Sequence, residues 1–223
     1  MRKLLFALPA LFLLASCGGA SNDDAKTTSE QAVAEQKGET LTIDTLATSI
    51  DWKATHKGGL APRWGKIGVS SGTVSVDKDS LSGGEFTINM SSLYVDTASV
   101  TEKDKKASDL AGHLKSPDFF DVAKFATAKF VITKVEPFTT AQASSLIADP
   151  NYLISGNLTL KDSTLNITFP SKVEITATGV TASAKFVIDR TAWGINYKAE
   201  GSPENWIISK DIEIGLTLKA KKN

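Results

Sequence analysis

From Leu41 onward, hydrophobic and polar residues alternate with a period of two, which is typical of β-strands rather than helices. The alternation is clearest near the C-terminus, where one parity holds Trp206, Ile208, Ile212, Ile214, Leu216 and Leu218. Comparable runs cover residues 86–90, 154–160, 173–177 and 182–188. Each run predicts a strand with one apolar and one polar face, and such strands are typical of antiparallel sheets.

Turn-forming residues separate these runs at residues 77–82, 161–164 and 178–180, so successive strands should pair as hairpins. Long strands that cover each other's edges favour closure over an open sheet. The pattern therefore predicts an all-β fold, an extended antiparallel barrel of about eight strands, which can fill with its own side chains or hold one small ligand. Residues 100–114 break the alternation and are rich in helix formers, which predicts one short helix, placed near the barrel mouth as a plug or lid.

The N-terminus has the features of a secretory leader. Arg2 and Lys3 precede an apolar run over residues 4–14, which is too short to span a membrane as a helix. The run ends in Leu-Ala-Ser-Cys, which resembles the bacterial lipobox, where the cysteine is acylated and becomes the first residue of the mature protein. We therefore expect a signal peptide over residues 1–16 and lipidation of Cys17, the alternative being an ordinary leader with a chance cysteine. Several acyl chains give stable anchoring, at about 0.8 kcal/mol per buried methylene.

The segment after the cysteine has the composition of a linker. Residues 18–39 contain one valine, no aromatic and no larger aliphatic side chain, so burial cannot offset the entropy of ordering them. A flexible coil of this length has a root-mean-square reach of about 25 Å. We expect residues 17–40 to comprise the lipidated cysteine and a flexible tether, and residues 41–223 to form one folded barrel domain.

Composition and charge narrow the range of partners. The 223 residues are 41% hydrophobic and 22% charged, which is typical of a globular domain. The formal charge is zero, with 25 basic and 25 acidic side chains, and removal of Arg2 and Lys3 with the leader lowers it to −2. Nucleic acid is not an expected partner, because no basic surplus exists to neutralise phosphates. The single cysteine excludes an intramolecular disulfide.

Five longer segments together carry a resemblance to a known family. They read SGTVSVDKDSLSGGEFTINMSSL (residues 71–93), GHLKSPDFFDVAKFATAKF (112–130), GNLTLKDSTLNITFP (156–170), FVIDRTAWGINY (186–197) and KDIEIGLTLKA (210–220). These segments are similar to the YceI family of periplasmic and secreted proteins, over nearly all of residues 41–220. The resemblance implies a lipocalin-like barrel with a tunnel for an isoprenoid chain, of the polyprenyl quinone or polyprenyl phosphate class. Relatives of the lipoprotein type are expected to have a histidine just ahead of the glycine in the second strand, where Arg63-Trp64-Gly65 stands here.

The apolar residues at alternate strand positions, which should face the barrel interior, are the candidate lining of such a tunnel. Small residues such as Gly156 and Ala184 share faces with large ones, which fits either close packing or a lengthwise void that an apolar chain would fill. With the resemblance, we expect a tunnel lined by Phe86, Ile88, Met90, Phe130, Ile132, Leu158, Leu160, Phe186, Ile188, Ile212 and Ile214. Arg190, Trp193 and Tyr197 are candidates for a mouth that grips a head group, with Arg190 as the anion donor. The alternative for these three is a salt-bridged, aromatic-capped corner of the barrel.

Candidate chemistry is sparse. The only histidines are His56 and His113, whereas a zinc site needs three or four ligands at motif spacing. No nucleophile elbow, dinucleotide-binding or phosphate-loop motif is present, so we expect no enzyme, no catalytic residue, no metal and no cofactor beyond a bound lipid. The leading hypothesis is a lipid-anchored protein of the bacterial cell envelope, at the outer membrane, that holds an isoprenoid lipid for carriage, storage or stress protection. The alternative is a solidly packed barrel that acts as a structural or interaction domain.

Overall fold

The computed structural model describes residues 25–56, 59–140, 143–199 and 208–222, and its regular structure is almost entirely β. The strands are β1 (Lys26–Ser29), β2 (Glu39–Ile43), β3 (Ser49–His56), β4 (Ala61–Asp77), β5 (Ser80–Val95), β6 (Thr127–Pro137), β7 (Tyr152–Leu160), β8 (Ser163–Ile175), β9 (Gly179–Asp189) and β10 (Asp211–Lys221). The helices are α1 (Ala107–Lys115) and two 3-10 helices, η1 (Thr97–Ser99) and η2 (Arg190–Trp193).

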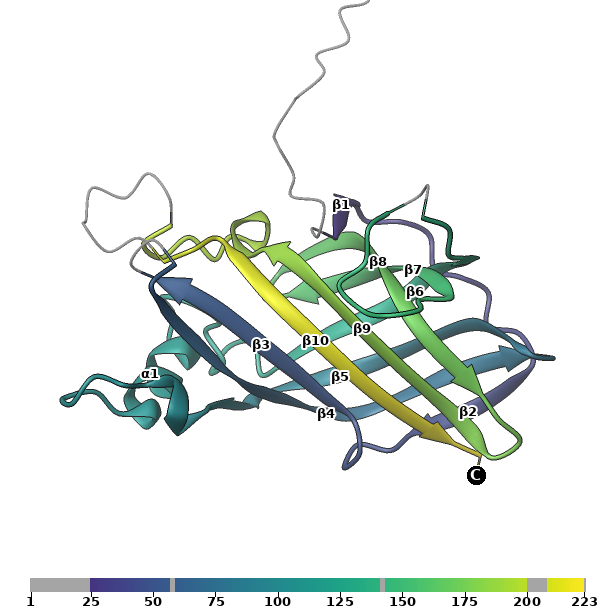
Figure 1. Ribbon diagram of the computed structural model, residues 1–223, viewed down its shortest axis with the longest axis horizontal. Coiled ribbons are helices and arrows are strands. Elements are labelled where there is room, and N and C mark those ends of the chain that lie inside the picture. The colour runs from purple at the N-terminus through teal and green to yellow at the C-terminus, as the bar shows by residue number, and fades with distance from the viewer. Residues whose placement is uncertain (1–24, 57–58, 141–142, 200–207, 223) are drawn as a thin grey trace, which may run out of the picture.

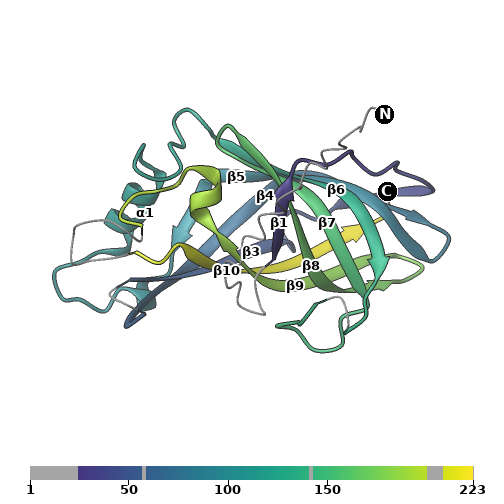
Figure 2. The same cartoon turned by 90° about the horizontal axis from the view of Figure 1, so that it is seen from above.

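Strands β3 to β10 close into an eight-stranded antiparallel barrel. Each strand pairs with the next along the chain, and β10 pairs back with β3. Strand β2 extends the wall at one end, where it pairs with both β4 and β10. Figures 1 and 2 show long tilted strands around the barrel and α1 at one end of it. The prediction of an all-β barrel of about eight strands with one short helix is confirmed.

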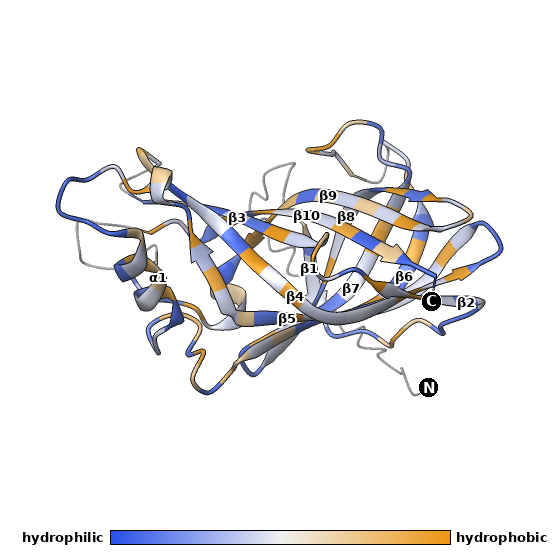
Figure 3. Ribbon diagram, turned by 90° about the horizontal axis from the view of Figure 1, so that it is seen from below, coloured by the Kyte–Doolittle hydropathy of each residue, from blue (hydrophilic) through white to orange (hydrophobic). Residues whose placement is uncertain are grey.

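The period of two in the sequence becomes an inside and an outside of the barrel. Along β9, for example, Phe186 and Ile188 are buried. Lys185, which precedes them with the opposite parity, points outward and pairs with Glu213 of β10 at 3.0 Å. Figure 3 shows the same change of hydropathy from residue to residue along the strands. The C-terminal alternation forms β10 from Asp211 onward, and Trp206 lies outside the described residues.

Helix α1 is shorter than the composition of residues 100–114 suggested. It begins at Ala107, and Glu102, which precedes it, is instead paired with Arg63, whose NH2 group lies 2.6 Å from Glu102 Oε2. It ends at Lys115, where the Ser116 N–H donates to the His113 carbonyl. Within the described ranges, no helix is both long and apolar enough to cross a membrane.

Part of the predicted tether is folded onto the barrel. Strand β1 pairs with residues 165–168 of β8, and the Ala25 N–H donates to the Val187 carbonyl of β9 at 2.8 Å. Strands β8 and β9 pair with each other only where residues 171–175 meet residues 180–184. Beyond that stretch the two strands diverge, and β1 therefore lies at the seam between them.

The chain then crosses the outer face of β7 and reaches β6. Backbone groups of Gln31 accept from Asn157 Nδ2 at 2.7 Å and donate to Asn157 Oδ1 at 3.0 Å, and Asn166 Nδ2 donates to the same oxygen at 2.9 Å. The Ala34 N–H donates to the Ile132 carbonyl. The prediction of a flexible tether over residues 17–40 is thus wrong from residue 25 onward, because hydrogen bonds to buried outward-facing asparagines hold a segment that has few apolar residues to bury. Residues 17–24 lie outside the described residues.

Candidate functional site

The end of the barrel next to α1 encloses an apolar cavity. Its volume is about 240 Å³, and it is partly open to solvent. Among the described residues that line it, only Thr55, His56, Arg63 and Arg190 are polar or charged. A void with so few hydrogen-bonding groups favours an apolar occupant over ordered water. The cavity argues against a solidly packed barrel.

Most of the predicted lining residues lie on this cavity. Ten of the eleven do so, namely Phe86, Ile88, Met90, Phe130, Leu158, Leu160, Phe186, Ile188, Ile212 and Ile214. The exception is Ile132, which is buried in the packed core next to a bulge in β6 and does not contact the cavity. Inward parity thus identified the correct faces of the strands, but not how far along each strand the void extends.

Sequence reasoning missed the wall contributed by β3. Ile50, Trp52 and Ala54 share one parity and all line the cavity. This stretch alternates over only three apolar positions, so its signal was weaker than that of the C-terminal strand. The Trp52 indole N–H donates to the Tyr94 carbonyl of β5 at 3.3 Å, which fixes the ring against the cavity wall.

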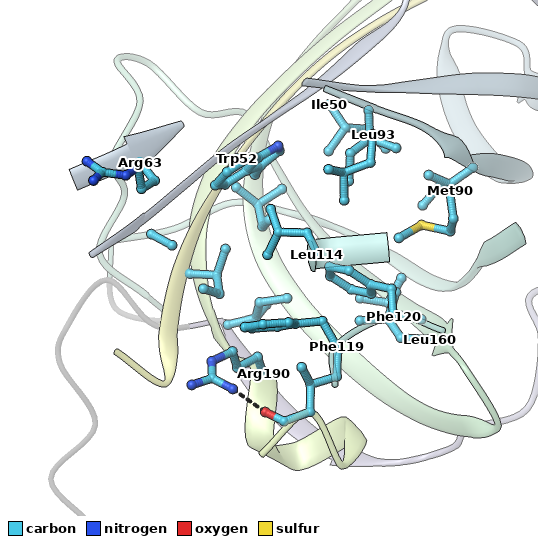
Figure 4. A pocket seen from close by; sticks show the side chains of 18 of the residues that line it. Ile50, Trp52, Arg63, Met90, Leu93, Leu114, Phe119, Phe120, Leu160 and Arg190 are labelled. Carbon is cyan, nitrogen blue, oxygen red and sulfur yellow. Dashed lines mark hydrogen bonds between the residues drawn. The ribbon is translucent and has the colours of Figure 1, made fainter. Parts of the chain in front are cut away.

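Helix α1 and the loop after it cover the open end of the cavity. Leu110 and Leu114 from α1 and Phe119 and Phe120 from the loop belong to the lining. Figure 4 shows Leu114, Phe119 and Phe120 among the other lining side chains, facing into the cavity. None of the helix residues is fully buried, although its leucines face the cavity. The helix therefore contacts the barrel through a thin apolar face, as expected for a lid.

Arg190 lies at the cavity, but its donors are already engaged. Nε donates to the Ser209 carbonyl at 3.0 Å, one terminal nitrogen donates to Ile195, and the other donates to Tyr197 and Ile208 at 3.0 and 2.9 Å. The side chain is 4% exposed, and burial lowers the pKa of Arg190 against the opposing influence of the neighbouring Asp189. The guanidinium thus links Ile195 and Tyr197, which follow η2, to Ile208 and Ser209, which precede β10.

The two aromatic candidates for the mouth do not line the cavity. Trp193 is 1% exposed, and its indole N–H donates to the Leu158 carbonyl at 3.0 Å. The Tyr197 ring packs edge-on against His113. Asp189 pairs with Lys210 at 3.1 Å. This geometry matches the alternative that the sequence left open, an aromatic-capped and salt-bridged corner of the barrel.

Two further basic residues at the cavity also have partners. Arg63 makes a two-point contact with the Glu102 carboxylate, at 2.5 and 2.6 Å, and donates to the Ser99 carbonyl at 2.8 Å. His56 Nδ1 lies 2.8 Å from the Ala61 carbonyl. Arg63 stands in the stretch where a histidine was expected from the resemblance, and it ties β4 to the segment that leads into α1.

His113 joins the lid to the corner around η2. Its Nε2 lies 3.0 Å from Asp118 Oδ2, and its ring packs edge-on against Phe119 and Tyr197, with centroids 5.1 and 5.0 Å away. In the part of the chain that the structure describes, no three His, Cys, Asp or Glu side chains gather as metal ligands would. The predicted lipidation site, Cys17, lies outside the described residues.

Comparison with known proteins agrees with this architecture. The barrel resembles the crystal structure of BcnA from Burkholderia cenocepacia, with a TM-score of 0.57 at 17% identity, over 80% of this chain and 99% of that one. It also resembles a polyisoprenoid binding domain from Saccharophagus degradans, with a TM-score of 0.54 at 12% identity, over 82% of this chain and 98% of that one.

Sequence comparison identifies the family. The UPF0312 protein ECA1782 of Pectobacterium atrosepticum is 27% identical over 218 residues, which cover 98% of this chain and 90% of that protein. The model of the YceI-like domain matches residues 41–220, which span the closed barrel and its lid. The chain therefore belongs to the family of YceI-like domain proteins.

Proposed function

We propose that this protein binds an apolar isoprenoid lipid in the barrel cavity and performs no chemistry on it. The observation that carries the proposal is the cavity itself, whose described lining is hydrophobic except at four residues and is covered by a helical lid. Its volume of about 240 Å³ lies just below the roughly 300–1,000 Å³ of small-molecule sites. The similar barrel from Saccharophagus degradans, described as a polyisoprenoid binding domain, supports this ligand class.

The charges around the cavity favour a neutral head group, such as a quinone, over a phosphate. Binding a phosphate away from water requires donors that are not committed elsewhere, because burial of an unpaired charge is costly. Arg190 donates to four backbone carbonyls, and Arg63 is paired with Glu102. A phosphate at this site would have to break these contacts, whereas a quinone head needs only weak polar contacts.

The ligand can be tested on protein exported from cells with Cys17→Ala, which removes the acylation site. Organic extraction and mass spectrometry should detect a co-purified isoprenoid lipid. Added quinone with a four-unit isoprenoid tail should stabilise ligand-depleted protein by about 2.7 kcal/mol at a concentration 100 times its dissociation constant, and the matching polyprenyl phosphate should stabilise it less. Empty preparations that are stabilised by neither lipid would overturn the proposal.

The sequence before the barrel suggests where the protein acts. We include in the proposal that Cys17 is acylated and anchors the protein in the bacterial cell envelope, at the outer membrane. The leader of residues 1–16 and its lipobox-like ending support this. Metabolic labelling with a fatty acid should mark the wild type and not Cys17→Ala, and the variant should move from the membrane fraction to the soluble fraction. Unlabelled wild-type protein in the soluble fraction would contradict the anchor.

A further inference from the structure

Four phenylalanine rings cross the barrel at the inner end of the cavity. Phe86 of β5 lies 5.3 Å from Phe130 of β6, measured between ring centroids. Phe130 lies 5.8 Å from Phe169 of β8, and Phe169 stacks on Phe186 of β9 at 4.1 Å. All four line the cavity. We call these four rings the phenylalanine floor.

A glycine in the intervening strand leaves room for the floor. Strand β7 runs between β6 and β8 and carries Gly156, which pairs with Ile132 of β6 and lies beside the Phe130 ring. A Cβ atom at Gly156 would overlap the Phe130 ring. The absence of a side chain at Gly156 therefore lets the Phe130 ring lie across the wall and reach Phe169.

Beyond the floor the barrel is packed. The next inward-facing residues along β6 and β9 are Ile132 and Ala184, which are buried in the core and do not contact the cavity. On β10 the lining extends one inward position further, to Leu216, and ends before Leu218, which is 4% exposed and lies outside the cavity lining. The space inside the barrel is thus a pocket with one closed end, rather than an open-ended tunnel.

The depth of this pocket follows from strand geometry. On β3 the lining runs from Ile50 to His56, six residue steps, which is about 20 Å along the strand and about 15 Å along the barrel axis at a tilt of about 40°. An extended isoprene unit, with four carbon–carbon bonds of about 1.5 Å along the chain, spans about 5 Å. The pocket is therefore about three to four extended units deep.

We propose that the phenylalanine floor sets the length of isoprenoid chain that the protein accepts, at about three to four units. This inference rests on the proposed lipid-binding function and adds a determinant of chain length to it. Units beyond the limit stay near the lid and contribute little, since they gain no further burial in the barrel. The four rings thus act as specificity-determining residues for the apolar tail of the ligand.

The test is a series of quinones with the same head and one to eight isoprene units, measured by displacement of a fluorescent lipid from the full chain. For wild type, affinity should rise at least about tenfold for each unit that enters the pocket and level off at about three to four units. Phe169→Ala removes one of the two middle rings of the floor and should extend the rise by about one unit. Phe169→Leu, which disturbs the core less, should shift the limit in the same direction by a smaller amount.

Leu218→Ala is the matched control, because it removes a buried side chain beyond the floor and should leave the limit unchanged. Three results would overturn the inference: a wild-type affinity that keeps rising through eight units, a limit that both Phe169 variants leave in place, or the same shift in Leu218→Ala. If no quinone of any length binds, the proposed function fails and the limit on chain length falls with it. If quinones bind without a limit set by the floor, only the present inference fails.

Discussion

Replacement of Arg190 by methionine tests the interpretation that this residue is structural. Methionine has a similar length and no donor, so Arg190→Met leaves the carbonyls of residues 195, 197, 208 and 209 without their partner. Hydrogen bonds from a charged donor contribute about 1.5–3 kcal/mol each, but removal of the buried charge also abolishes its desolvation cost. The net loss should be about 3–5 kcal/mol, the usual cost of breaking a buried charged network.

Urea unfolding at pH 7 followed by tryptophan fluorescence measures this loss, and the melting temperature should fall by about 10 °C. Arg63→Met provides a comparison, because that guanidinium is paired with a partly exposed carboxylate and should matter less, about 1–2 kcal/mol. A loss under 1 kcal/mol for Arg190→Met would refute the structural role. Weaker binding of anionic lipids together with unchanged stability would instead restore Arg190 as a head-group donor.

Three further predictions concern the corner, the floor and the N-terminal segment. Asp189 accepts two hydrogen bonds from Thr191, so Asp189→Ala should cost about 1 kcal/mol at pH 7. Burial raises the pKa of Asp189, but the hydrogen bonds from Thr191 and Lys210 outweigh this effect and hold the pKa below its ordinary value. The difference in stability between wild type and Asp189→Ala should therefore shrink as the pH falls through this pKa. A difference between their urea midpoints that stays constant from about pH 6 to pH 3 would contradict this. Gly156→Ala should lower stability by about 1–3 kcal/mol in thermal melts, because the new methyl group overlaps a floor ring, and an unchanged melt would be inconsistent with that packing. Asn157→Ala removes both bonds to Gln31 and should speed amide hydrogen exchange over residues 25–36 about tenfold, whereas unchanged exchange would show that other contacts hold the segment.

The sequence predicted the wall of the cavity because the direction of a strand side chain is a local property. Phe186 and Ile188 face inward since they share a parity, and this holds whichever strands lie opposite. The end of the cavity is not local. It depends on rings from different strands meeting across the barrel, as Phe130 and Phe169 do, and on Gly156 between them. No periodicity in the chain encodes which inward residues meet, so the pattern alone cannot distinguish Ile132, which lies in the packed core, from residues that line the cavity.

Polar contacts between distant segments are the second feature that the sequence does not predict. The segment at residues 25–38 has the composition of a linker, yet asparagines on the outward face of the barrel order it through its backbone. The sequence leaves Arg190 open between a head-group donor and a structural residue, because its neighbours in the chain do not reveal that the carbonyls of residues 208 and 209 accept its hydrogen bonds. Hydrogen bonds between distant segments leave no pattern of spacing in a single sequence.

The engaged arginines and the phenylalanine floor together determine how the pocket can discriminate between ligands. At the mouth, Arg63 is paired with Glu102 and Arg190 donates to backbone carbonyls, so neither residue selects strongly for an anionic head group. At the inner end, four rings close the barrel, so the apolar chain meets a fixed stop. Burial of apolar groups supplies affinity in proportion to the length of tail that fits in the pocket. Because the floor is rigid, affinity stops rising once the tail reaches it. The pocket should therefore select its ligand by the length of the tail much more than by the chemistry of the head.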